Sequence, residues 1–160
     1  MKQWINRMIV ILYCLIIFYV LFGRRIQYGG LYFSGSMWEY AKMYAYLIPF
    51  KTIGKLVAGA KEGTMGVLFV LKNLLGNLVL FFPMGMYWGL RKKKETIGMF
   101  LIKISVILLA IELVQFLSKL GSFDVDDFIL NLAGGLGGFW LGNKIFLQTH
   151  EKHPISPLDK

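Results

Sequence analysis

Hydrophobic positions gather into four long blocks that shorter polar segments separate. The blocks cover residues 4–22, 67–90, 97–117 and 125–146. At about 1.5 Å of rise per residue, an α-helix of this length crosses a hydrocarbon core roughly 30 Å thick. The pattern predicts an all-α membrane protein, a four-transmembrane-helix bundle that forms one domain over residues 1–160. A polar tail is expected over residues 147–160.

The first block could also be read as a secretory signal peptide, because Lys2 and Arg7 provide a basic start. Its exit, LFGRRI, lacks the small-residue pattern of a cleavage site, and Arg24 and Arg25 follow at once. We therefore interpret the first block as an uncleaved transmembrane helix.

The loop between the first two blocks holds no apolar run long enough to cross a bilayer. Residues 37–50 read MWEYAKMYAYLIPF, and such aromatic residues favour the membrane interface. Pro49 should end any helix there, since it lacks an amide donor and restricts Ile48. We predict an interfacial or re-entrant element in this first loop.

Composition supports the bilayer as the environment. Hydrophobic residues make up 56% of the chain and charged residues 17%, whereas soluble domains carry about 25% charged residues. The net charge of +9 comes from basic residues that mostly flank the apolar blocks. This placement favours membrane orientation and anionic lipid over nucleic acid. Cys14 is the single cysteine, so no internal disulfide can form.

Polar residues inside the apolar blocks are the candidate functional groups. Glu112 and Gln115 lie three residues apart, and Asp127 and Asn131 lie four apart, so each pair shares one helix face. If the blocks span the membrane, these residues lie at similar depth, together with polar residues of the second block. The candidate ligand-binding set is Lys72, Asn73, Asn77, Glu112, Gln115, Asp127 and Asn131.

Two interpretations of this set stay open. In one, the amides and carboxylates serve only as interhelical hydrogen bonds that fix packing. In the other, they form a ligand site, since ionisable groups within membranes are usually functional. Asp124 is expected to cap the fourth helix, with Asp126 and Asp127 complementing its positive end. Gly134, Gly138 and Gly142 continue the Asp127 face as a small-residue ladder for close helix packing. We expect no metal site, because His150 and His153 have no third ligand nearby.

Four segments together resemble one protein family. They read IPFKTI (48–53), NLLGNLVLFFPMG (73–85), ELVQF (112–116) and GSFDVDDFILNLAGGLGG (121–138). In this order they are similar to the VanZ-like family of small bacterial membrane proteins, named for a teicoplanin-resistance accessory protein. The recurring polar positions of that family correspond here to Asn73, Asn77, Pro83, Glu112, Gln115, Asp127 and Asn131.

The resemblance implies a multi-pass protein of the bacterial cell membrane, of a family in which some members lower glycopeptide susceptibility. One hypothesis is a protein without catalytic activity that binds membrane lipid, a lipid-linked peptidoglycan precursor or the glycopeptide antibiotic. The alternative is an intramembrane enzyme that modifies a lipid headgroup, with Glu112 and Asp127 as acid and base or as metal ligands. Whether the protein uses a cofactor is not determined by the sequence.

Topology yields the first testable prediction. The RKKK run at residues 91–94 is the densest positive charge beside two membrane ends, so this loop and both termini should be cytoplasmic. In a Cys14→Ala background, a Ser36→Cys variant should react with an impermeant maleimide on intact cells, and a Lys94→Cys variant should not. Labelling of Lys94→Cys from outside would overturn this topology.

Overall fold

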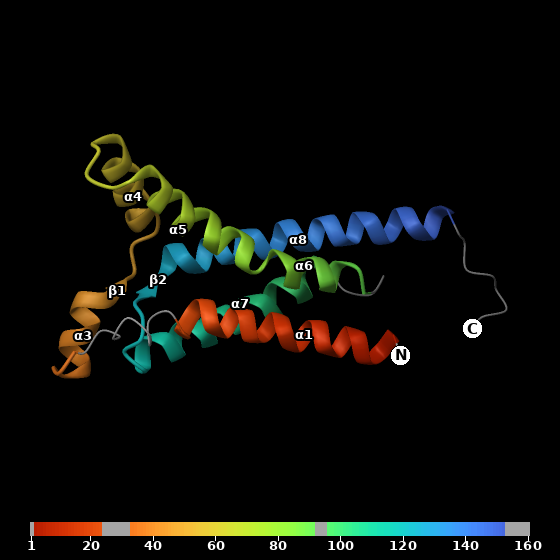
Figure 1. The fold of residues 1–160 in the computed structure, drawn as a ribbon, viewed down its shortest axis with the longest axis horizontal. Helices are drawn as coiled ribbons and strands as arrows, with labels where there is room; N and C mark the ends of the chain where they lie inside the picture. The colour runs from red at the N-terminus through yellow and green to blue at the C-terminus, as the bar shows by residue number, and fades with distance from the viewer. Residues whose placement is uncertain (1, 24–32, 92–95, 153–160) are drawn as a thin grey trace. The chain divides into compact units, whose positions relative to one another are not determined.

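The computed structural model describes residues 2–23, 33–91 and 96–152, and these residues are mostly helical. Helices carry most of the described chain, and two short strands form one parallel pair (Figure 1). The chain divides into two compact units. The first joins Met1–Leu47 to Ala110–Asp124, and the second joins Ile48–Leu109 to Val125–Lys160.

The first unit begins with α1 (Lys2–Phe18), which ends in a π-helical turn, η1 (Tyr19–Gly23). α3 (Met37–Tyr44) follows, and Ser36 caps it through a reciprocal pair of hydrogen bonds with Glu39. The backbone N–H and then the hydroxyl of Ser36 lower the pKa of the Glu39 carboxyl. These hydrogen bonds stabilise the ionised carboxylate. Their contribution to stability is therefore fully present above the ordinary carboxyl pKa and is lost as pH falls through the lowered pKa.

Aromatic packing forms the centre of the first unit. Tyr40 is fully buried, and its ring contacts Phe33, Tyr44 and Phe116. Its hydroxyl donates a 2.8 Å hydrogen bond to the carbonyl of Gly121. The strands β1 (Ala45–Tyr46) and β2 (Phe123–Asp124) pair in parallel. Backbone pairing therefore also joins the first loop to the segment that ends at Asp124.

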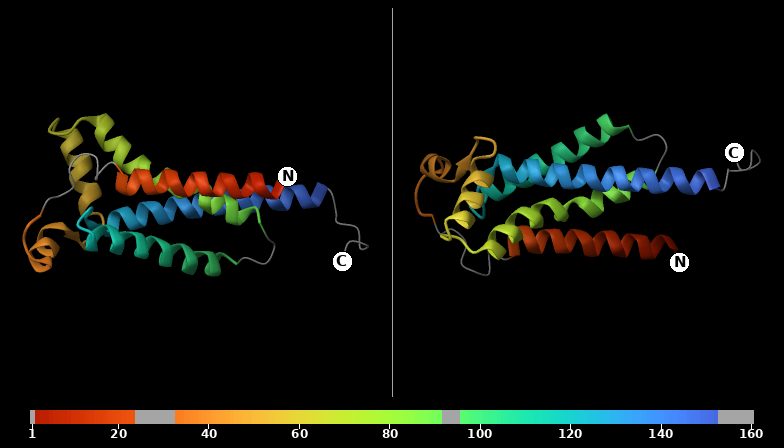
Figure 2. Two further views of the ribbon diagram at one scale, coloured as in Figure 1. Left: turned by 60° about the horizontal axis from the view of Figure 1, so that its bottom comes forward. Right: turned by 90° about the horizontal axis from the view of Figure 1, so that it is seen from above.

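The second unit is built around α8 (Val125–Lys152). α4 (Lys51–Lys61) leads into α5 (Val67–Leu80), and α6 (Phe82–Gly89) continues from it. Both α5 and α6 pack on α8, and the views in Figures 1 and 2 agree that α6 lies along it. The part of α7 (Ile97–Leu117) that belongs to this unit also reaches α8, where Phe100 stacks on Phe139 with ring centroids 4.4 Å apart.

Glycines bring these backbones together. A Cβ atom on Gly134, Gly138 or Gly142 would overlap the carbonyl oxygen of Leu78, Phe82 or Met86, respectively. From α6, Gly85 and Gly89 meet the backbone of α8 in the same way. The sequence prediction that Gly134 and Gly138 pack against another helix is therefore confirmed.

Pro83 and Gly85 inside the second block predict a kink in its helix, and the structure has a break there between α5 and α6. Pro83 has no N–H to donate to the carbonyl of Val79, and the amide of Phe81 donates to that carbonyl instead. The helix is interrupted at Phe81 and resumes with Pro83 in its first turn, where proline is tolerated. The predicted kink in the second block is confirmed.

Two of the described helical segments are long and apolar enough to cross a membrane, Val67–Gly89 and Ile97–Leu117. The apolar stretch Arg7–Gly23 is shorter. The four-helix transmembrane bundle and the interfacial or re-entrant loop thus stay predictions. The helix that contains the fourth block continues past residue 146 to Lys152, and no Gly or Pro interrupts residues 147–152.

Several sequence predictions fall outside the described residues. These are the arginines at the exit of the first block, the lysines of the RKKK run and the end of the tail: Arg24, Arg25, Lys92, Lys93, Lys94 and residues 153–160.

The glycine contact predicts a stability difference between two Gly→Ala variants. Gly138→Ala should force α6 from α8 and destabilise the protein by about 1–3 kcal/mol, the usual cost of overpacking. Gly76→Ala is the matched control, since a Cβ there meets nothing within 4 Å, and should be neutral or stabilising by at most about 1 kcal/mol. Thermal unfolding in detergent compares the two, and equal melting temperatures would contradict the backbone contact.

Candidate functional site

Two adjacent carboxylates open α8, and they have different partners. Asp126 is 1% exposed and accepts backbone hydrogen bonds from Phe50, Thr52 and Ile53 at 2.5, 2.8 and 3.0 Å. These amides belong to the first turn of α4, whose own N-cap residue, Phe50, supplies no side-chain cap. Asp126 therefore provides the acceptor that the exposed N–H groups of a helix start require, and its charge complements the helix dipole.

Asp127 meets a polar group of α5 instead. Its carboxylate accepts a hydrogen bond from the Nδ2 group of Asn77, which is half-buried. One helical turn further along α8, Asn131 is 4% exposed, and its Oδ1 atom has no hydrogen-bond partner among the described residues. We call Asn77, Asp127 and Asn131 the α5–α8 polar cluster.

The other two residues of the second block lie on the outside of α5. Lys72 and Asn73 are both exposed. The Asn73 amide donates a 2.8 Å hydrogen bond to the carbonyl of Phe69 in its own helix. Of the three polar residues predicted in this block, Asn77 is the one that the described contacts join to α8.

Glu112 and Gln115 belong to the first unit, where both are buried on α7. Gln115 donates a 3.1 Å hydrogen bond to the carbonyl of Leu21 in η1, one of the carbonyls that a helix end leaves without an intrahelical donor. A carboxylate oxygen of Glu112 accepts from the backbone amide of Asp124, which directly precedes α8. Both side chains thus join α7 to other segments of their own unit.

The chemistry that each group can offer follows from these contacts. The Asp126 carboxylate is committed to three amides, so it is a structural group. The α5–α8 polar cluster combines an ionisable carboxylate with a buried acceptor, and both suit a ligand that presents O–H or N–H donors. Glu112 and Asp127, the candidate acid and base, lie in different units. Their paired role stays a prediction, as does the seven-residue ligand site.

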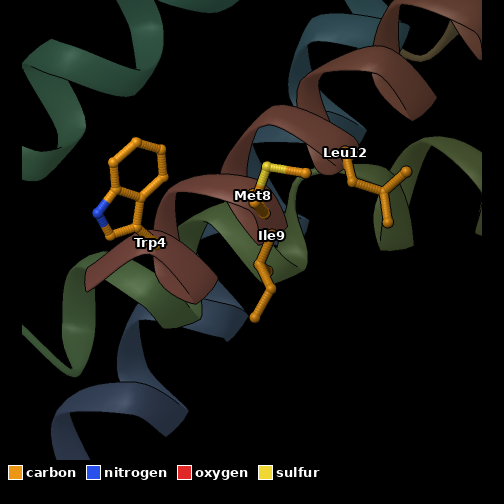
Figure 3. A pocket seen from close by; sticks show the side chains of 4 residues that line it. All are labelled: Trp4, Met8, Ile9 and Leu12. Carbon is orange, nitrogen blue, oxygen red and sulfur yellow. The ribbon is translucent and has the colours of Figure 1, made fainter. Parts of the chain in front are cut away.

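A hollow on α1 has a different character. Trp4, Met8, Ile9 and Leu12 line it, and Figure 3 shows these four side chains projecting from the helix. All four are well exposed. These four side chains are apolar or aromatic and offer no acid or base for catalysis.

Sequence reasoning missed the partner of Asp126. It placed Asp126 and Asp127 correctly in the first turn of α8, but it treated both as complements of their own helix end. One signal could have revealed the contact to α4. The IPFKTI segment starts a helix without a Ser, Thr, Asp or Asn at its N-cap, so its amides need an acceptor from elsewhere in the chain.

A comparison with known protein families matches most of the chain. A family model described as VanZ/LLP1 matches residues 10–147. This range includes all seven residues of the candidate ligand-binding set. This match confirms the resemblance seen in the four sequence segments. No curated protein matches the chain, and no solved structure does.

The Asp126 contact predicts a local effect on α4. Asp126→Ala should leave the first-turn amides of α4 without their acceptor, at a cost of about 0.5–2 kcal/mol, as for other lost caps. Hydrogen exchange measured by mass spectrometry should then accelerate in peptides that cover residues 50–53. Asp127→Ala, one residue along, is the control and should leave exchange in these peptides unchanged. Equal acceleration in both variants would show that general loosening, not the cap, is responsible.

Proposed function

The chain belongs to the VanZ/LLP1 family, and on this premise we propose that it binds a lipid or lipid-linked cell-wall component and lowers susceptibility to teicoplanin. In this proposal it is a multi-pass protein of the bacterial cell membrane. Its four apolar blocks cross the bilayer as a bundle, and both termini are cytoplasmic. The apolar segments Val67–Gly89 and Ile97–Leu117 support the membrane location.

The observation that carries the proposal is the α5–α8 polar cluster. A buried acceptor without a partner is costly, typically about 1–3 kcal/mol, and most native proteins contain few. Among the residues that the structure describes, the Asn131 oxygen is such an acceptor. It lies one turn from a carboxylate on a helix that glycines hold against α5 and α6. The hydroxyl and amide groups of a lipid headgroup or of a lipid-linked sugar and peptide are donors of the kind that this cluster accepts.

The proposal can be tested at Asn131 because packing and binding predict opposite outcomes there. Asn131→Leu keeps the branched shape and the number of heavy atoms of the side chain, although leucine is larger, and removes the buried acceptor. If Asn131 serves only packing, the variant should be as stable as wild type or more so, and fully active. If Asn131 binds a ligand, the variant should be stable but should lose its effect on teicoplanin susceptibility.

The assay expresses each form in a teicoplanin-sensitive Gram-positive host and normalises susceptibility to the amount of protein in the membrane. Asp127→Asn, which removes charge at constant size, should also lose activity. Gln148→Leu, an exposed position on the same helix, is the control for adding a leucine to α8. A wild type that alters susceptibility, together with active Asn131→Leu and Asp127→Asn variants, would refute the ligand role of the cluster.

Lipid mass spectrometry separates binding from catalysis in the same strains. A binder should leave the lipid composition unchanged while one lipid co-purifies with wild type and is lost from Asn131→Leu. A new or missing lipid species that depends on Asp127 would support the enzyme alternative instead.

A further inference from the structure

A different surface of the second unit combines exposed lysines with an exposed apolar tip. The lysines are on α4, where Lys51, Lys55 and Lys61 all face outward. The opposite face of α4, with Ile53, Leu56 and Ala60, is partly buried, so the helix is amphipathic and its basic face points away from the protein. α4 ends at Lys61, a few residues before the candidate span that begins at Val67.

The apolar tip is the three-residue turn just before α4, residues 48–50. Ile48 is 60% exposed and Phe50 is 65% exposed, with Pro49 exposed between them. Both large apolar side chains are thus mostly uncovered by the described residues. They are adjacent in sequence to Lys51, so apolar and cationic groups emerge at one place.

The tip is held in this arrangement by the backbone. Phe50 is in the left-handed region, with φ of 62°, which is unfavourable for a bulky residue. Its amide is fixed by the buried Asp126 carboxylate, and its carbonyl accepts from Gly54 at 2.9 Å. The amide of Lys51 donates to the carbonyl of Ile48 at 3.3 Å, which closes the turn. A buried charge thus maintains a strained turn that presents two apolar side chains.

We propose that residues 48–50 and the basic face of α4 form a docking site for the surface of an anionic phospholipid membrane. Ile48 and Phe50 insert among the upper parts of the acyl chains, and Lys51, Lys55 and Lys61 bind headgroup phosphates. Each lysine near an anionic surface adds roughly a fivefold increase in partitioning, so charge complementarity selects anionic over zwitterionic lipid. This site shares no residue with the α5–α8 polar cluster. An experiment that refutes one of the two proposed roles therefore does not refute the other.

The experiment uses the full chain in a Cys14→Ala background with Ala58→Cys, an exposed position on α4, labelled with an environment-sensitive fluorophore. The labelled protein is reconstituted into vesicles of phosphatidylcholine alone or with increasing phosphatidylglycerol. The emission should shift to shorter wavelength as phosphatidylglycerol increases. At a given phosphatidylglycerol fraction, Lys51→Gln should lower the ratio of membrane-docked to undocked probe by about fivefold, and adding Lys55→Gln should abolish the shift.

Matched variants separate the two parts of the site. Lys144→Gln, an exposed lysine on α8, should respond like wild type. An Ile48→Ser and Phe50→Ser double variant should keep its fold, since both side chains are exposed, but should lose most of the shift in all vesicles. An identical response of wild type and the Lys51→Gln, Lys55→Gln variant would overturn the proposal and leave α4 as a solvated face. A shift that depends on Ile48 and Phe50 but not on phosphatidylglycerol would refute recognition of anionic lipid.

Discussion

The second unit depends on direct contact between backbones. The carbonyl oxygens of Leu78, Phe82 and Met86 face three glycines of α8, and both sets repeat every four residues. Apolar side chains gain little by leaving lipid for protein, so close backbone packing is a principal source of attraction between membrane helices. At this range the glycine Cα–H groups can also interact weakly with the carbonyls.

The register of this contact sets the directions of the helices. Residue numbers rise together in the two contacting rows, so α5 and α6 run parallel to α8. α7 runs the other way in this unit, because Phe100 stacks on Phe139 while Ile104 lies against Gly135, four residues earlier. Alternating directions are what consecutive membrane crossings require. The same α8 face continues into Asn131 and Asp127, so glycine packing also determines what these polar side chains meet.

The sequence predicted the features that arise from local spacing. Three- and four-residue repeats placed Gly134 and Gly138 on a packing face, and Pro83 marked the helix break. It could not predict helix rotation, which decides that Asn77 meets Asp127 while Asn73 bonds to its own helix. Nor could it assign Asp126, because that contact joins residues 76 positions apart. The depth of a polar residue in a bilayer follows from its position in the sequence. Whether two such residues touch depends on how their helices pack.

The cap that Asp126 gives to α4 also constrains the order in which the protein can be completed. α4 leaves the ribosome before α5, α6, α7 and α8, yet its acceptor is in the first turn of the last of these helices. During synthesis, the left-handed turn at Phe50 has no buried carboxylate to hold it. Domains usually fold from the N-terminus as they emerge, but here an early segment reaches its final conformation only when the last helix arrives. A chain truncated before Asp126 would retain every residue of α4 and lack the carboxylate that caps its first turn.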